Sequence, residues 1–332
     1  MKHDLPPLNG RPPMGNSPMD GRPPMGMPPF GRPPMGGPGG PPPGWTPPMA
    51  DISWVKRKFL DVPYAGESKS QMFDLYLPEE GDGPFPLLIH IHGGGFAFGD
   101  KRDDHMDAYL TGIKRGYAVA SVEYRKSGEA IFPAAVNDCR EAIRYIKAHA
   151  AEYSVDPERI GVIGGSAGGN LTAMMGMNVP NGDFPGEDKN AVCGETPFVI
   201  VAVPQFGPMS FGTMTEQAIA NGISEVHADP ANMPESKYLG VSIAEATQAQ
   251  LDAANPATYA SPVMAPMLVQ HGTMDHLVPY AQSVEFVEAL KAKGCGDKVE
   301  FTPLEGADHE DKMFTSEENL DLVFAFLDKY MK

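Results

Sequence analysis

From about residue 54 onward, segments with the apolar pattern of a β-strand alternate with segments that have the apolar pattern of an α-helix. Short apolar runs of strand length are separated by segments in which apolar residues recur every three or four positions. The runs lack the polar alternation of a half-exposed strand, which is typical of strands buried in a parallel sheet. The predicted strands are residues 72–77, 86–92, 117–122, 159–164, 198–203, 267–271 and 298–302.

Helical segments occupy the intervals between several of these runs. An apolar stripe at residues 136, 139, 143, 146 and 150 predicts a helix that begins just after Pro133. Further helices are expected at 170–177, around 284–290 and around 320–327. The alternation of strands and helices predicts a layered α/β domain.

Two regions depart from this alternation. Proline and glycine fill 27 of the first 50 positions, and the hexapeptide GRPPMG occurs three times there, so residues 1–50 are expected to be a disordered tail rather than a packed unit. The tail is either a plain solvated extension or a ligand for a proline-binding module. Residues from about 204 to 255 are rich in Met, Ala, Pro and Gly and are expected to form a cap-like insertion within the catalytic domain of residues 51–332. We expect the insertion to form the acyl pocket, with its methionines 209, 214 and 233 as an adaptable apolar wall.

The composition of the chain argues against several classes of binding partner and of site. The formal net charge of −17 disfavours nucleic acid, anionic membrane surfaces and polyanionic substrates. The three cysteines are far apart, which indicates neither a disulfide framework nor a zinc site. We expect no membrane span. The chain starts without the apolar stretch of a signal peptide, which favours a cytoplasmic location but leaves the compartment open. The sequence does not predict an oligomeric state.

The strongest chemical motif is GGSAG at residues 164–168. It follows a predicted strand and precedes a predicted helix, the context in which G-x-S-x-G presents a nucleophilic serine, here Ser166. Such a turn needs small neighbours, which Gly164, Gly168 and Gly169 supply.

A second motif, HIHGGGF at residues 90–96, ends another predicted strand. Its successive glycines leave backbone amides exposed, and such amides can stabilise an oxyanion. His90 and His92 could instead form a metal pair, but no third ligand has suitable spacing. The acidic residues between 100 and 107 lack the spacing of a calcium loop. We therefore expect neither a metal nor a cofactor.

Two further polar residues follow later strands. Asp275 comes after the strand at 267–271, and His309 follows the strand at 298–302. Ser166, Asp275 and His309 thus occur in the chain order nucleophile, acid, base. Asp308 is an alternative acid, but a neighbour in sequence usually points away from the histidine ring. These residues predict a serine hydrolase with a Ser-His-Asp triad.

These motifs resemble the α/β-hydrolase superfamily, in its hormone-sensitive-lipase-like esterase branch. Segments EYR at 123–125, SGEA at 127–130 and HGT at 271–273 are most similar to bacterial esterases of the bifunctional feruloyl and acetylxylan type. The resemblance implies a doubly wound, mostly parallel sheet with helices on both faces and a small cap. It also implies an oxyanion hole formed by the amides of Gly94, Gly95 and Ala167.

The function expected from the residues and the resemblance together is hydrolysis of short-chain acyl or aryl esters, with acetyl or feruloyl esters of plant polysaccharide as substrates. A general short-chain carboxylesterase and a peptidase of the prolyl-oligopeptidase kind are alternatives within the hydrolases. A binding protein on a hydrolase scaffold is the alternative outside them.

Overall fold

An eight-stranded sheet forms the centre of the molecule. The computed structural model describes residues 48–187, 194–223 and 229–332. The strand order is β1-β2-β4-β3-β5-β6-β7-β8. Among these strands, β2 runs opposite to the other seven, which confirms the predicted mostly parallel sheet. The strands are β1 (Arg57–Pro63), β2 (Met72–Leu77), β3 (Phe85–Ile91), β4 (Ala118–Val122), β5 (Val155–Gly165), β6 (Val201–Gln205), β7 (Met267–Gly272) and β8 (Val299–Leu304).

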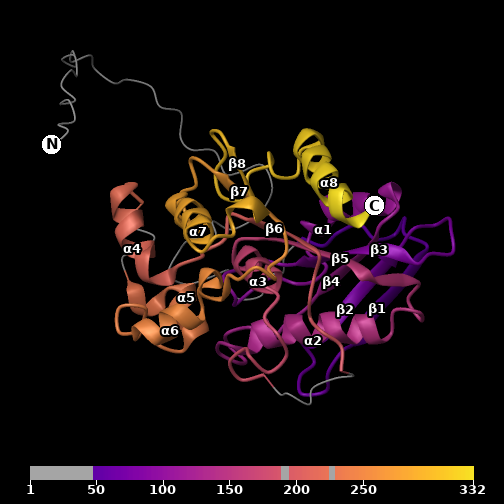
Figure 1. Cartoon of the computed structure of the whole chain (residues 1–332), viewed down its shortest axis with the longest axis horizontal. Coiled ribbons are helices and arrows are strands. Elements are labelled where there is room, and N and C mark those ends of the chain that lie inside the picture. The colour runs from indigo at the N-terminus through magenta and orange to yellow at the C-terminus, as the bar shows by residue number, and fades with distance from the viewer. Residues whose placement is uncertain (1–47, 188–193, 224–228) are drawn as a thin grey trace, which may run out of the picture.

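Helices cover both faces of this sheet. Helices α1 and α8 pack with one buried apolar cluster, while α2, α3 and α7 pack with the other. Figure 1 shows α8 and α2 on opposite sides of the strands. The α-helices are α1 (Met106–Leu110), α2 (Ala134–Ala148), α3 (Ala167–Gly176), α4 (Phe211–Ala220), α5 (Pro234–Leu239), α6 (Gln248–Ala253), α7 (Ala281–Ala292) and α8 (Glu317–Met331). The 3₁₀ turns are η1 (Thr111–Arg115), η2 (Pro230–Asn232), η3 (Pro256–Tyr259) and η4 (Gly296–Lys298).

The uninterrupted apolar runs of the central strands follow from this two-sided cover. All seven residues of β3 are buried, and Leu87 and Ile89 belong to one apolar cluster while Leu88 belongs to the other. Side chains on a strand alternate between faces, so a strand covered on both sides needs apolar residues at consecutive positions.

Most predicted strands agree with the structure to within about three residues, with two differences. Strand β1 was not predicted: it lies at the edge of the sheet with mostly exposed or half-buried side chains, so it lacks an apolar run. Strand β5 begins at Val155, earlier than the predicted residue 159, because its first residues are largely polar and half-buried.

The region between β6 and β7 contains α4, η2, α5, α6 and η3, and Figure 1 shows α4, α5 and α6 grouped away from α8. The Asn170 side chain on α3 donates hydrogen bonds to the carbonyls of Pro208 (2.8 Å) and Ala254 (3.4 Å), near the two ends of the predicted insertion. Asn170 thereby ties the insertion to the helix that follows Ser166.

The predicted tail lies outside the described residues up to residue 47. The last part of it, residues 48–50, contacts the segment that precedes α1: Asp104 N donates to Pro48 O (2.9 Å), and Ala50 N donates to Arg102 O (2.8 Å). In the described parts of the chain, no helix is both long and apolar enough to cross a bilayer.

Candidate active site

The chemical motifs meet at one edge of the sheet. Ser166 follows β5, Gly93 follows β3, Asp275 follows β7 and His309 follows β8. These four strands run parallel to one another, so their carboxyl ends lie at the same edge. This is the usual position of binding sites in open α/β sheets.

Ser166 is held in a tight turn between β5 and α3. Its φ of 56° and ψ of −127° lie in a region that non-glycine residues rarely adopt. The turn is fixed by a hydrogen bond from Ser166 N to the Gln205 carbonyl (3.0 Å) on β6. A Cβ at Gly168 would lie 2.1 Å from the Ile91 carbonyl, and a Cβ at Gly164 would lie 2.4 Å from it. The two glycines are therefore needed for the close approach of this turn to β3.

Ser166, His309 and Asp275 form a continuous hydrogen-bonded chain. His309 Nε2 lies 3.0 Å from Ser166 Oγ, and His309 Nδ1 lies 2.7 Å from Asp275 Oδ2. A carboxylate can only accept, so Nδ1 carries the ring proton and Nε2 is free to accept the serine hydroxyl hydrogen. This arrangement can take a proton from the Ser166 hydroxyl as the oxygen attacks a carbonyl.

The electrostatics of this chain favour a charged pair. Burial is the largest influence on the pKa of His309 and acts to lower it, but the Asp275 carboxylate outweighs burial, and the net pKa is raised. Burial also acts to raise the pKa of Asp275, yet His309 and His271 hold it far below its usual range. Asp275 is thus ionised at neutral pH and stabilises a positive charge on His309.

Asp275 is positioned by contacts beyond His309. Its Oδ1 accepts hydrogen bonds from the amides of Leu277 (2.9 Å) and Val278 (2.8 Å). His271 Nε2 lies 3.2 Å from Oδ2 and 3.0 Å from the Val278 carbonyl, so this nitrogen carries hydrogen. Motif analysis did not predict this role of His271, because the contact depends on how the loop after β7 places Asp275 beside the ring.

Asp308, the alternative acid, has other partners. Its Oδ1 accepts hydrogen bonds from the amides of His276 (3.0 Å) and His309 (2.7 Å), and it also contacts the His276 ring. Its carboxylate therefore holds the loop around His309, while the His309 ring itself faces Asp275.

The glycine loop after β3 lies next to Ser166. A Cβ at Gly93 would lie 3.3 Å from Ser166 Cβ. Gly94 adopts a φ of 99°, and its carbonyl accepts hydrogen bonds from Ala97 N (3.1 Å) and Phe98 N (2.9 Å), which turn the loop back on itself. Ala167 is the first residue of α3, so its amide has no partner within the helix. The glycine loop and the first residue of α3 thus both lie next to the serine.

A buried ion pair supports the glycine loop, and motif analysis did not predict it. His92 Nδ1 lies 2.9 Å from the Gly93 carbonyl, and His92 Nε2 lies 3.2 Å from Glu123 Oε1. Both nitrogens face acceptors, so both carry hydrogen and the ring is cationic. Burial acts to lower the pKa of His92, but Glu123 raises it overall, and the pKa of Glu123 falls to about 2. The Tyr124 ring stacks on His92 with centroids 4.4 Å apart.

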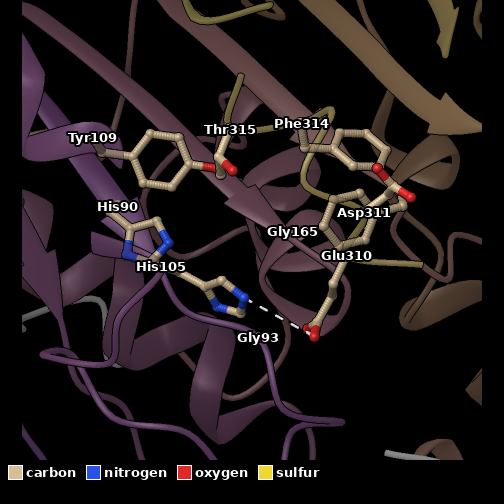
Figure 2. Close-up of a pocket in the computed structure, with 10 residues that line it drawn as sticks. His90, Gly93, His105, Tyr109, Gly165, Glu310, Asp311, Phe314 and Thr315 are labelled. Atoms are coloured by element: carbon tan, nitrogen blue, oxygen red, sulfur yellow. Dashed lines mark ion pairs between the residues drawn. The ribbon is translucent and has the colours of Figure 1, made fainter. Parts of the chain in front are cut away.

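A small pocket lies next to the serine turn, and its lining includes His105 and Glu310 (Figure 2). His105 and Glu310 form an ion pair (4.0 Å) that joins the segment before α1 to the loop after His309. The other lining residues are His90, Gly93, Tyr109, Gly165, Phe206, Asp311, Phe314 and Thr315.

The other residues that the sequence analysis considered are held in contacts within the protein. His90 stacks on the Tyr109 ring, and burial lowers its pKa well below the usual range. Among the residues that the structure describes, Asp103, Asp104 and His105 place potential ligand atoms within 4.8 Å of one another, but Asp103 Oδ1 already accepts the His105 amide (3.2 Å). The methionines at 209, 214 and 233 are all buried within the apolar cluster of α2, α3 and α7.

A family model matches residues 73–290, well over half of the chain, and its description is BD-FAE. The chain belongs to the BD-FAE family. The predicted α/β-hydrolase resemblance is confirmed, and the curated homologues of this BD-FAE chain include carboxylic ester hydrolases. The probable carboxylic ester hydrolase LipM of Mycobacterium tuberculosis is 28% identical over 234 residues, which cover 70% of this chain and 51% of LipM. The chain spans about half the length of the curated relatives that it matches first.

Two solved structures extend the comparison. A truncated carbohydrate esterase from gut microbiota superimposes on 85% of this BD-FAE chain and 98% of its own, with a TM-score of 0.72 and 26% identity. A bifunctional GH43-CE protein from Bacteroides eggerthii covers 83% of this chain and 35% of its own, with a TM-score of 0.72 and 27% identity. The predicted fold class is confirmed by these likenesses together with the observed sheet.

Proposed function

We propose that this BD-FAE protein is a carboxylic ester hydrolase that uses Ser166, His309 and Asp275 as its catalytic triad. The observation that carries the proposal is the hydrogen-bonded chain from Ser166 Oγ through His309 to Asp275 Oδ2, with separations of 3.0 and 2.7 Å. The ester hydrolases among its curated relatives support the same activity.

In the first half of the reaction, Ser166 Oγ attacks the ester carbonyl carbon while its proton moves to His309 Nε2. The amides of Gly94, Gly95 and Ala167 donate hydrogen bonds to the oxyanion of the tetrahedral intermediate. The bond to the alcohol oxygen then breaks, and that oxygen takes the proton from His309. An acyl-serine remains.

In the second half, a water molecule gives a proton to His309 and attacks the acyl carbonyl. The bond to Ser166 Oγ breaks, the serine recovers the proton, and the carboxylic acid leaves. Asp275 remains ionised throughout, because its role is to orient the ring and stabilise the imidazolium. The proposed steps need water and these residues, without a metal or cofactor.

For the substrate, we propose acetyl or feruloyl esters of plant polysaccharide. The two structural likenesses above are to a carbohydrate esterase and to a bifunctional GH43-CE protein, which favours an ester carried by a sugar. The net charge of −17 also disfavours carboxylate-rich or phosphorylated substrates, since they would be repelled. A general short-chain carboxylesterase is the second candidate, and the similarity to LipM favours it.

The test is hydrolysis of p-nitrophenyl acetate, p-nitrophenyl butyrate, methyl ferulate and acetylated xylan by the wild type and by Ser166→Ala. We expect the variant to lose at least about 10³-fold in kcat on every ester that the wild type hydrolyses. Ser53→Ala is the matched control, because Ser53 is exposed and its hydroxyl contacts Asp51.

The pattern of activity separates the proposals. Preference for acetylated xylan or methyl ferulate supports a polysaccharide esterase, while preference for the p-nitrophenyl esters supports a general carboxylesterase. A wild type that hydrolyses none of the four, or a Ser166→Ala variant that remains active, would overturn the proposed mechanism.

A further inference from the structure

Helix α5, from the region between β6 and β7, rests directly on the glycine loop. A Cβ at Gly95 would lie 3.0 Å from Pro234 Cβ, the first residue of α5. The ring of Tyr238, on the same helix, stacks on Phe96 with centroids 3.9 Å apart and planes 10° apart. The residues of α5 next to Pro234 are therefore close to the proposed oxyanion hole.

One of those residues, Glu235, is 6% exposed and has a buried carboxyl group whose Oε2 lacks a hydrogen-bond partner among the described residues. Within the same residues, no ion pair joins Glu235 to a lysine or arginine. Buried acidic side chains are almost always paired, and none of the residues that the structure describes supplies a partner for this carboxyl oxygen.

The charge on His309 is one of the influences on the pKa of Glu235. Burial raises the pKa of Glu235 to about 7, its own backbone amide opposes this, and the charge on His309 also acts to lower it. Glu235 is thus close enough to His309 to respond to its charge. In the proposed mechanism, His309 gives its proton to the leaving alcohol. We therefore expect a polar group in the neighbourhood of His309 to lie on the alcohol side of the bound ester.

We propose that Glu235 binds a hydroxyl group on the alcohol half of the substrate. The substrate class is then esters of polyols and sugars that keep a free hydroxyl near the acylated oxygen. This inference rests on the proposed esterase function and makes its substrate class more specific. A hydroxyl both donates and accepts, so it can pair with the carboxyl in either protonation state.

The experiment compares two acetyl esters that differ in their free hydroxyls, glycerol monoacetate and propyl acetate, by pH-stat titration with the full chain. The measured quantity is the ratio of kcat/KM for the first ester to kcat/KM for the second. We expect the wild type to favour glycerol monoacetate and Glu235→Leu to lower the ratio at least about tenfold, because a site built to bind a hydroxyl discriminates strongly against its absence. Lys237→Gln, an exposed position on the same helix, is the control and should leave the ratio unchanged.

A second readout separates binding from a structural role. Leucine fills nearly the volume of the glutamate without an unpaired polar atom, so Glu235→Leu should have a Tm equal to or above that of the wild type. Glu235→Gln, which keeps the shape but loses the stronger acceptor, should lower the ratio several-fold.

Three outcomes would overturn the inference. The first is a ratio within about twofold of the wild type in both variants, which would mean that Glu235 does not contact the hydroxyl. The second is an equal loss on both esters, which would mean that Glu235 acts on the triad instead. A wild type that hydrolyses neither ester would refute the proposed function, and the inference with it.

Discussion

Asp275→Asn is the substitution that tests the proposed triad most directly, because it replaces the oxygen that faces His309 and His271 with an NH₂ group, which donates instead of accepting. Asp275 Oδ1 accepts the amides of Leu277 and Val278, so an asparagine keeps its oxygen toward those amides. Its NH₂ group then faces His309 Nδ1, where the aspartate now accepts at 2.7 Å. A donor at that position forces Nδ1 to be an acceptor and moves the ring hydrogen to Nε2.

The change of tautomer sets the expected loss in kcat. A protonated Nε2 cannot accept the hydrogen of Ser166, so general-base catalysis is lost while the rest of the site remains. Losses of about 10⁴ in kcat are typical of this change in a triad, which corresponds to about 5.4 kcal/mol of transition-state stabilisation. The pKa of His309 should also fall, since Asp275 is the main influence that raises it against burial.

The assay is the pH dependence of kcat/KM with p-nitrophenyl acetate. Activity requires neutral His309, so the acid limb of the wild-type profile should have its midpoint above 6.5, the ordinary value for histidine, and Asp275→Asn should lower that midpoint along with the rate. Asp308→Asn is the control: it keeps an oxygen for the His309 amide, and we expect less than about a threefold loss. A loss of about 10³ or more in Asp308→Asn, with Asp275→Asn nearly unaffected, would refute the reasoning.

Two further substitutions test the supporting structure. Gly94→Ala should lower kcat about 10²- to 10³-fold in the same assay, because the residue has a φ of 99° and its Cβ would lie 2.6 Å from the Phe98 carbonyl, which displaces the proposed oxyanion loop. Activity within threefold of the wild type would argue against a role for this loop. Asp138→Ala should lower the free energy of unfolding by about 3 kcal/mol in urea denaturation, because it leaves the guanidinium of Arg125, now paired at 2.8 and 2.9 Å, without its main partner. A loss under about 1 kcal/mol would contradict that estimate.

Local pattern was sufficient to predict the framework of this protein. The strands of a sheet covered on both faces must be apolar at consecutive positions, and the turn at Ser166 must have glycines because β3 passes within van der Waals contact of it. Both requirements act on residues adjacent in the chain, so they can be read without a structure. Strand β1 lies at the edge of the sheet, and most of its side chains are exposed or half-buried. It therefore has no apolar run, and the sequence pattern did not predict it.

The partners of the chemical groups were decided only by the tertiary structure. The sequence offered two acids for His309, and the folded loops directed Asp275 to the ring and Asp308 to the His276 and His309 amides. The pairing of His92 with Glu123 joins residues 31 positions apart. Such pairs depend on which strands are neighbours and where each loop turns, whereas hydrophobic period and motif spacing report only on local geometry. Local pattern therefore predicts the fold class and the candidate residues, and the packing of the strands and loops decides which of those residues are in contact.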